Sequence, residues 1–167
     1  MRRLTWAVGL IGVITMALSL LGRKNVHAEL MIPAPAEAIW SVLTDAEGYQ
    51  DWNPVFTSVT GEYRPGAKMA YLMRDKSGNE TDVTASVAKL DEARELNQFG
   101  GIRGILTFDH HWLLEPVEGG IRVTQHEEYR GIGVWFWDPS WFKTAYERAN
   151  EALRDRVLGN VEEETAP

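Results

Sequence analysis

The sequence predicts an α+β fold in which a curved antiparallel sheet of about seven strands wraps around one long C-terminal helix. Three observations predict it. Six consecutive segments alternate apolar and polar residues and are joined by links of hairpin length. Apolar residues near the C-terminus recur at spacings of 3 or 4 over roughly five turns. A further strand and two short helical segments come before them. Because the sheet needs a cover, and only the last helix is long enough, the two should pack together.

The first elements of the domain are expected to be a strand and a short helix. Residues 25–32 have the composition of a strand, and Pro35 suits the first position of the helix that follows. Ile39, Trp40 and Leu43 fall on one face of that helix, which should therefore pack on the core.

A second short helix and the remaining strands follow. Residues 44–47 have the spacing of a capping box, which predicts a helix near Tyr49. Turn residues then separate alternating segments, and these are the expected strands. They cover residues 55–63, 67–74, 81–90 and 96–99, and two long strands within 104–131.

The two long strands should form a hairpin that turns at Glu118 and Gly119, since glycine supplies the positive φ of a two-residue turn. This turn sets the register: the numbers of facing residues sum to 237, and His110 lies opposite Glu127. Side chains alternate between the two faces of a strand. One mostly apolar face therefore carries Phe108, His110, Trp112, Leu114, Val123, Gln125, Glu127 and Tyr129. An apolar wall with a few placed polar groups is typical of a small-molecule pocket.

The long helix is expected to begin at Asp138, a good N-cap, and Pro139, a good first residue. Its apolar stripe includes Tyr146 and Leu153 and ends near Gly159. Asn150 lies on the same stripe, where it is expected either to contact a ligand or to bond to a strand.

The first 24 residues form a separate module in this prediction. An uncharged run of nineteen residues, 4–22, lies between cations at both ends and is close to the roughly 20 that span a bilayer. We expect a single-pass membrane anchor, with the domain outside the cytoplasm because short tails with two arginines tend to stay inside. The alternative is a signal peptide cleaved after Ala28, but the apolar run exceeds the usual signal core of about 7–15 residues. The expected domain is 25–160, followed by an acidic tail, 161–167.

Charge and composition exclude several functions. The chain has 17 basic and 24 acidic residues, a net charge of −7, and removal of the first 24 residues leaves 13 against 24, or −11. Such a domain is not expected to bind nucleic acid, which needs a basic face. The chain has no cysteine, which excludes disulfides and thiolate chemistry. It contains no nucleophile elbow, phosphate-binding loop or dinucleotide fingerprint, so no cofactor is expected.

Several motifs together resemble those of the SRPBCC superfamily, the helix-grip fold of START lipid-transfer and polyketide cyclase-like proteins. They lie at residues 32–36, 39–40, 43–45, 52–54, 66, along the hairpin from His110 to Gly131, and at 150–153. The resemblance covers about residues 25–160. It implies a cavity between the sheet and the last helix, holding a hydrophobic small molecule or lipid.

Cavity-wall candidates are large or adaptable side chains on inward positions. They are Trp52, Met69, Tyr71, Met73, Trp112 and Tyr129. An ordinary hydrophobic core would use the same residues, and that alternative stays open.

His110 and Glu127 are the weak catalytic candidates and also candidate ligand contacts. A facing carboxylate and imidazole can orient a polar group or move a proton, although a buried structural pair looks the same in sequence. On the opposite face of the hairpin, His111, His126, Asp109 and Glu128 have the chemistry of metal ligands. Since that face should meet water, no metal site is expected there.

The sequence therefore favours a membrane-tethered binding domain for a hydrophobic small molecule or lipid. The alternatives are a cyclase or dehydratase that uses His110 and Glu127, and a module that binds a protein partner. An aromatic cluster at 135–137, with Trp141 and Phe142, is expected either to close one end of the barrel or to rest against lipid.

Overall fold

The structure is a computed structural model, and it describes residues 2–165. Helix α1 spans Arg2–Leu21 and leads directly into strand β1, Arg23–Ile32. The remaining elements are α2 (Ala36–Leu43), α3 (Tyr49–Trp52), β2 (Phe56–Thr60), β3 (Lys68–Arg74), β4 (Glu80–Asp91), β5 (Glu95–Ile102), β6 (Leu106–Val117), β7 (Gly120–Arg130), the 3₁₀ turn η1 (Ile132–Trp135) and α4 (Ser140–Thr165).

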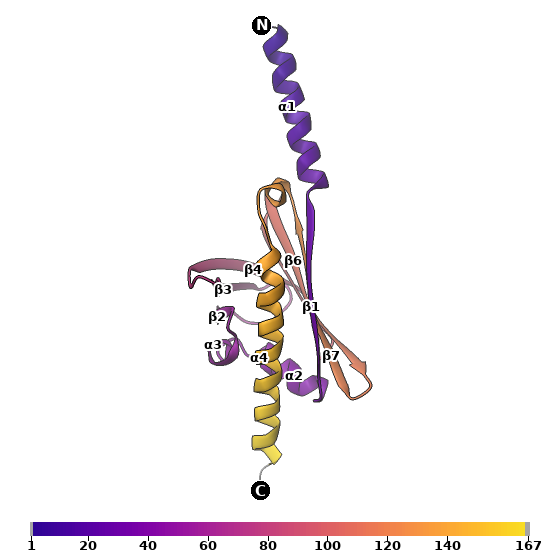
Figure 1. The fold of residues 1–167 in the computed structure, drawn as a ribbon, viewed down its shortest axis with the longest axis vertical. Coiled ribbons are helices and arrows are strands. Elements are labelled where there is room, and N and C mark those ends of the chain that lie inside the picture. Colours follow the sequence, from indigo (N-terminus) through magenta and orange to yellow (C-terminus); the bar gives the residue numbers. More distant parts are fainter. Residues whose placement is uncertain (1, 166–167) are drawn as a thin grey trace.

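The seven strands form one antiparallel sheet in the order β1-β7-β6-β5-β4-β3-β2, which curves around α4 (Figure 1). The predicted α+β helix-grip fold, with its seven strands and two short helices after the first, is therefore confirmed. β1 is an edge strand that pairs only with β7, and it brings the start of the domain beside its longest hairpin.

The register of that hairpin also agrees with the sequence. Val117 pairs with Gly120 and His110 with Glu127. Gly119 has a φ of +89°, the left-handed conformation that the turn requires.

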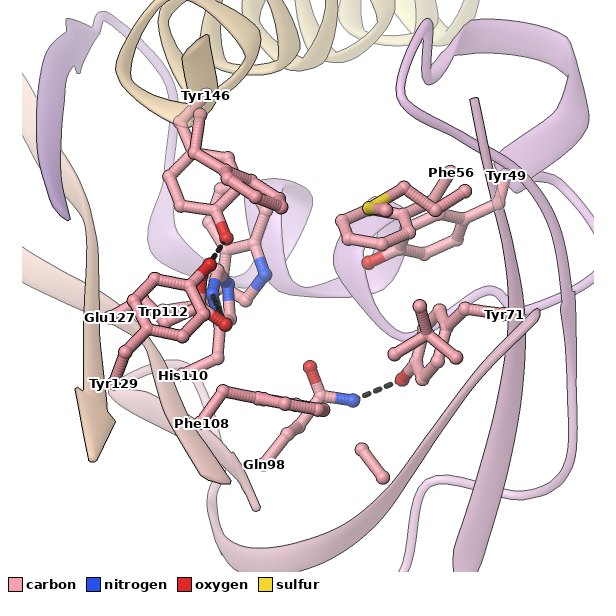
Figure 2. A pocket seen from close by; sticks show the side chains of 14 residues that line it. Tyr49, Phe56, Tyr71, Gln98, Phe108, His110, Trp112, Glu127, Tyr129 and Tyr146 are labelled. Atoms are coloured by element: carbon pink, nitrogen blue, oxygen red, sulfur yellow. Dashed lines mark hydrogen bonds and ion pairs between the residues drawn. The ribbon is translucent and has the colours of Figure 1, made fainter. Parts of the chain in front are cut away.

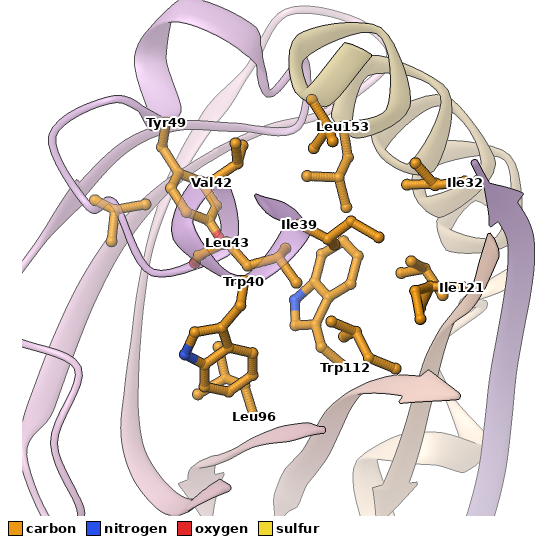
Figure 3. Packing of buried hydrophobic residues seen from close by; sticks show 14 of the residues in the cluster. Ile32, Ile39, Trp40, Val42, Leu43, Tyr49, Leu96, Trp112, Ile121 and Leu153 are labelled. Carbon is orange, nitrogen blue, oxygen red and sulfur yellow. The ribbon is translucent and has the colours of Figure 1, made fainter. Parts of the chain in front are cut away.

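The core lies between the concave face of the sheet, α2 and α4 (Figure 3). Helix α2 contributes Ile39 and Leu43, both fully buried, as its 3.6-residue period predicts. Leu153 and Val157 of α4 are fully buried as well. These residues fill the half of the barrel beside α2, and the cavity described below lies toward the N-terminal half of α4.

Strands β4 and β5 separate along part of their length. They are paired from Asp91 and Glu95 up to Ala85 and Gly100, but the paired register of the described residues stops there. β5 was expected to end at Phe99, yet it continues past Gly100 and pairs with β6. A side chain at Gly100 would collide with the ring of Phe108, so glycine extends the strand here instead of ending it.

Helix α1 corrects the prediction of a membrane segment. Among the described residues, no helix is long and apolar enough to cross a membrane. The expected single-pass anchor, and with it the predicted membrane location, is therefore wrong. The physical reason lies in the last turn: Trp135 Nε1 donates to the carbonyl of Leu18 at 2.9 Å, and Ser19 Oγ to that of Gly104 at 2.7 Å. Residues counted toward a span thus contact the domain, and Arg23 already belongs to β1.

Helix α4 starts as predicted and ends later than predicted. Asp138 Oδ1 accepts a hydrogen bond from the Ser140 amide at 3.0 Å, and Asp138 Oδ2 accepts one from the Ser140 hydroxyl at 2.8 Å. Gly159 keeps a helical conformation instead of the left-handed one that ends helices, and α4 runs on to Thr165. The expected acidic tail therefore begins inside the helix.

Candidate functional site

A cavity of about 120 Å³ lies between the sheet and the N-terminal half of α4 (Figure 2). Fourteen residues line it, and eight of them are aromatic. They are Tyr49, Phe56, Tyr71, Met73, Val83, Ala85, Gln98, Phe108, His110, Trp112, Glu127, Tyr129, Phe142 and Tyr146. The walls come from β2 to β7, from α3 and from α4, so residues far apart in sequence meet here.

Glu127 is the centre of a polar cluster on one side of the cavity. Its Oε2 atom accepts hydrogen bonds from the hydroxyls of Tyr129 and Tyr146. Tyr129 follows Glu127 by two residues on β7 and so faces the same side, whereas Tyr146 reaches it from α4. The carboxylate therefore joins strand and helix at the edge of the cavity.

The two phenols stay neutral in this environment. Burial is the main cause that raises the pKa of Tyr146, and the nearby charge of Glu127 raises it further. The same two causes, in the same order, raise the pKa of Tyr129. Both hydroxyls therefore act as neutral hydrogen-bond donors to the carboxylate at any ordinary pH.

His110 faces the same carboxylate but does not bond to it directly. Its Nδ1 atom lies 3.8 Å from Glu127 Oε1, too far for a hydrogen bond, and the two side chains are 7% and 6% exposed. The imidazole is held edge-on between two rings, with centroids 5.9 Å from Trp112 and 5.2 Å from Tyr146. Packing thus fixes the orientation of the imidazole.

A second polar pair lies across the cavity from Glu127 (Figure 2). Gln98 Nε2 on β5 donates to the hydroxyl of Tyr71 on β3. Burial raises the pKa of Tyr71, so this phenol also stays protonated. The cavity is therefore an aromatic space with a polar group at each of two opposite sides.

Six of the nine predicted ligand contacts line this cavity: Tyr71, Met73, His110, Trp112, Glu127 and Tyr129. The other three lie elsewhere. Met69 is fully buried in the packed core, and Trp52 packs at a tilt against Tyr49 at a centroid distance of 4.9 Å. Asn150 is buried one turn beyond the cavity, where its Oδ1 accepts a hydrogen bond from Gln125 Nε2 at 2.8 Å.

Sequence reasoning missed several lining residues, above all Tyr146 and Gln98. A tyrosine on the apolar stripe of α4 is itself a signal, because a buried hydroxyl needs a polar partner. Gln98 lies in a predicted strand on the same side as Leu96, two residues earlier, and this is the same signal. The sequence could not predict that Tyr146 bonds to Glu127 or that Gln98 bonds to Tyr71. Local patterns do not show how close α4 comes to the sheet, or how close β3 comes to β5.

The outer face of the hairpin carries the four residues with metal-ligand chemistry. His111 Nδ1 lies 3.0 Å from Glu95 Oε1, and His111 Nε2 lies 3.2 Å from Asp109 Oδ1. His111 and His126 rings lie 6.2 Å apart. Within the described part of the chain, no group of these side chains is arranged to hold a metal ion.

The aromatic cluster before α4 is divided between the interior and the surface. Trp137 packs edge-on against Tyr129 at 4.6 Å, and Phe142 contacts both of them. Trp135 and Phe136 are exposed. The inner members close the end of the barrel beside the Glu127 cluster.

Comparison with known proteins agrees with the helix-grip fold. The family model described as "Polyketide cyclase / dehydrase and lipid transport" matches residues 23–158. No curated protein matches the chain.

Solved structures with a similar fold come from several bacteria. A protein from Thermus thermophilus is 19% identical, with a TM-score of 0.66, over 82% of this chain and 99% of its own. The Zhui aromatase/cyclase from Streptomyces sp. R1128 is 16% identical, with a TM-score of 0.66, over 83% and 96%. A protein from Nitrosomonas europaea is 17% identical, with a TM-score of 0.65, over 83% and 96%. At these identities the likeness shows the fold alone, whereas the family model covers most of the chain. The chain therefore belongs to the polyketide cyclase/dehydrase and lipid transport family, within the SRPBCC superfamily that its sequence resembles.

Proposed function

We propose that this protein binds a hydrophobic small molecule in the cavity between the sheet and α4. The observation that carries the proposal is the lining: eight aromatic side chains surround an open space, and the polar side chains among them lie on two opposite sides. Such a wall offers dispersion contacts over a ring and a few directional bonds that orient it.

The size of the cavity favours a compact ligand over a long lipid chain. A space of about 120 Å³ is comparable to the roughly 150 Å³ of an engineered cavity that binds benzene. The size of this space therefore favours a molecule with a single ring. Membership of a family described by both cyclases and lipid transport supports a small-molecule ligand of this general kind.

Methyl NMR offers a direct test, because Met73 lines the cavity and Met31 is exposed on β1. Toluene titrated into protein with labelled methionine methyls is expected to shift the Met73 signal saturably and to leave Met31 unchanged. A Met73 signal that does not move, or moves together with Met31, would contradict the proposal.

A pair of variants on β4 locates the binding. Ala85 is buried and lines the cavity, so Ala85→Phe is expected to fill it and abolish the toluene shift. Ala88 lies on the same strand and is exposed, so Ala88→Phe adds the same side chain and should leave binding intact. Equal binding by both variants would place the toluene outside the cavity.

A cyclase or dehydratase is the second candidate function. The observation that favours it is the buried His110 imidazole beside Glu127, since an oriented imidazole can act as acid or base. This enzyme would lose turnover in His110→Ala while still binding its ligand, whereas a pure binding protein would change only its affinity.

A further inference from the structure

We propose that the cavity selects organic amines, with the ammonium group of a compact ligand bound between the Glu127 carboxylate and the surrounding aromatic ring faces. This inference rests on the proposed binding function and deepens it, because it assigns the charge of the ligand.

The lining of the cavity includes a negatively charged side chain and no lysine or arginine among the described residues. The negatively charged side chain is that of Glu127. The ion pairs of Arg23 and Arg130 go to the neighbouring Glu128 on the outer face, not to Glu127. No lysine or arginine balances the charge of this buried carboxylate, and His110, 3.8 Å away, can do so only when its imidazole is protonated.

The geometry of Glu127 leaves one oxygen free for that partner. Both phenols donate to Oε2, so they saturate one side of the carboxylate without bringing any positive charge. For Oε1 the described residues provide one polar neighbour, His110 Nδ1 at 3.8 Å, which is beyond hydrogen-bond distance. An ammonium group carries three donors and no acceptor, and so matches an acceptor-only oxygen.

The rings around this oxygen favour the same ligand. Trp112, Tyr129 and Tyr146 stand beside the Glu127 cluster, and Phe108 closes the cavity from β6 (Figure 2). The face of an aromatic ring carries partial negative charge and attracts cations, which is how aromatic cages hold ammonium ligands. An anion in the same place would meet the Glu127 carboxylate, which repels it.

The groove that leads to the cavity also carries a negatively charged side chain. Where β4 and β5 separate, a groove of about 590 Å³ lies on the other side of Phe108 and shares Val83, Ala85 and Tyr129 with the cavity lining. Asp82 is the charged residue of this groove among the described ones. A ligand that entered here would pass one carboxylate and reach another, so cations are favoured along the whole route.

Three compounds with one ring and different charge provide the test: benzylamine, benzyl alcohol and benzoate, which are cationic, neutral and anionic at neutral pH. They are titrated into the full chain, with the Met73 methyl signal as readout and Met31 as internal reference. Benzylamine is expected to bind at least about tenfold more tightly than benzyl alcohol, as a charge-assisted bond would give, and benzoate should bind weakest.

The Glu127→Gln variant separates charge from shape. It keeps the size of the side chain and removes the negative charge, so benzylamine should lose about tenfold in affinity or more while benzyl alcohol changes by less than about threefold. Retained binding of benzyl alcohol also shows that the cavity of the variant is intact. An equal loss of both compounds would mean that Glu127 only supports the fold, and would overturn the inference.

The remaining outcomes distinguish the inference from the proposed function. If none of the three compounds moves Met73 in the unaltered protein, the binding function itself fails. If benzoate binds as tightly as benzylamine, the cavity binds ligands but does not select amines, and this inference alone is overturned.

Discussion

Tyr146 on α4 donates a hydrogen bond to Glu127 on β7, so the long helix is tied to the sheet at the wall of the cavity. The bond is buried and its acceptor is a carboxylate. The polar groups that face the open space therefore also hold the fold together, and their substitution should affect stability as well as binding.

Substitution of Tyr146 by phenylalanine removes this bond and leaves the ring. Because hydrogen bonds to charged groups contribute about 1.5–3 kcal/mol, Tyr146→Phe should lower the free energy of unfolding by that amount. Urea denaturation followed by circular dichroism measures the change. Tyr129→Phe removes the other donor to the same oxygen, so the effects of the two variants should not add in the double variant. Simple additivity would show that the two bonds are independent.

Asn53 supports the turn between α3 and β2 through its side chain. Its buried Oδ1 accepts hydrogen bonds from the amides of Val55 at 2.9 Å and Phe56 at 2.8 Å. Asn53→Ala leaves both amides without this acceptor, and a loss of roughly 1–3 kcal/mol in unfolding free energy is expected. Asn53→Asp retains the acceptor and should lose less than the alanine variant. A more stable alanine variant would contradict the proposed role of the side chain.

Gly100 makes room for the ring of Phe108. A Cβ at this position would collide with that ring and lie 2.5 Å from the Thr84 carbonyl, so Gly100→Ala should destabilise the protein by about 1–3 kcal/mol. Gly159 on α4 has no neighbour within 4 Å of an added Cβ. Gly159→Ala is the matched control and should raise stability by up to about 1 kcal/mol, since alanine favours helix. Thermal denaturation of both variants compares them, and a Gly100→Ala protein as stable as the control would refute the collision.

Stability should fall in mild acid because of His126. Burial lowers its pKa below the ordinary value of 6.5, and repulsion from His111 and His27 adds to this, although Glu128 opposes it. With a folded-state pKa below the unfolded one, the unfolded chain binds more protons between the two values. The free energy of unfolding therefore decreases as the pH falls through about 6.5. Urea denaturation at about pH 7.5 and pH 5.5 should show this loss, and His126→Gln should reduce it. An unchanged pH dependence in the variant would assign the effect to other groups.

The sequence was sufficient to predict the fold and one wall of the cavity. Periodicity located the strands, and the turn at Gly119 set the register that puts His110 opposite Glu127, because a two-residue turn leaves no freedom in strand pairing. The motif at Trp52–Pro54 correctly marked the break before β2.

Long-range contacts account for what could not be predicted. The contact between Tyr146 of α4 and Glu127 depends on how the helix lies across the sheet, and local sequence patterns do not specify this. Met69 and Asn150 face the interior as expected from the strand and helix periods. Whether an inward side chain meets packed core or open space depends on all its neighbours. The N-terminal helix was misjudged because a count of uncharged residues does not reveal that its last turn contacts the domain at Trp135.

The separation of β4 and β5 has a kinetic consequence. The paired register of the described strands stops at Ala85 and Gly100, and Phe108 lines both the cavity and the groove outside it. We therefore expect a movement of the Phe108 ring to connect the two spaces. Exchange of a ligand by this route would leave α4 and the buried core in place. The residence time of the ligand would then depend on the Phe108 ring, whereas resistance to unfolding would depend on the core.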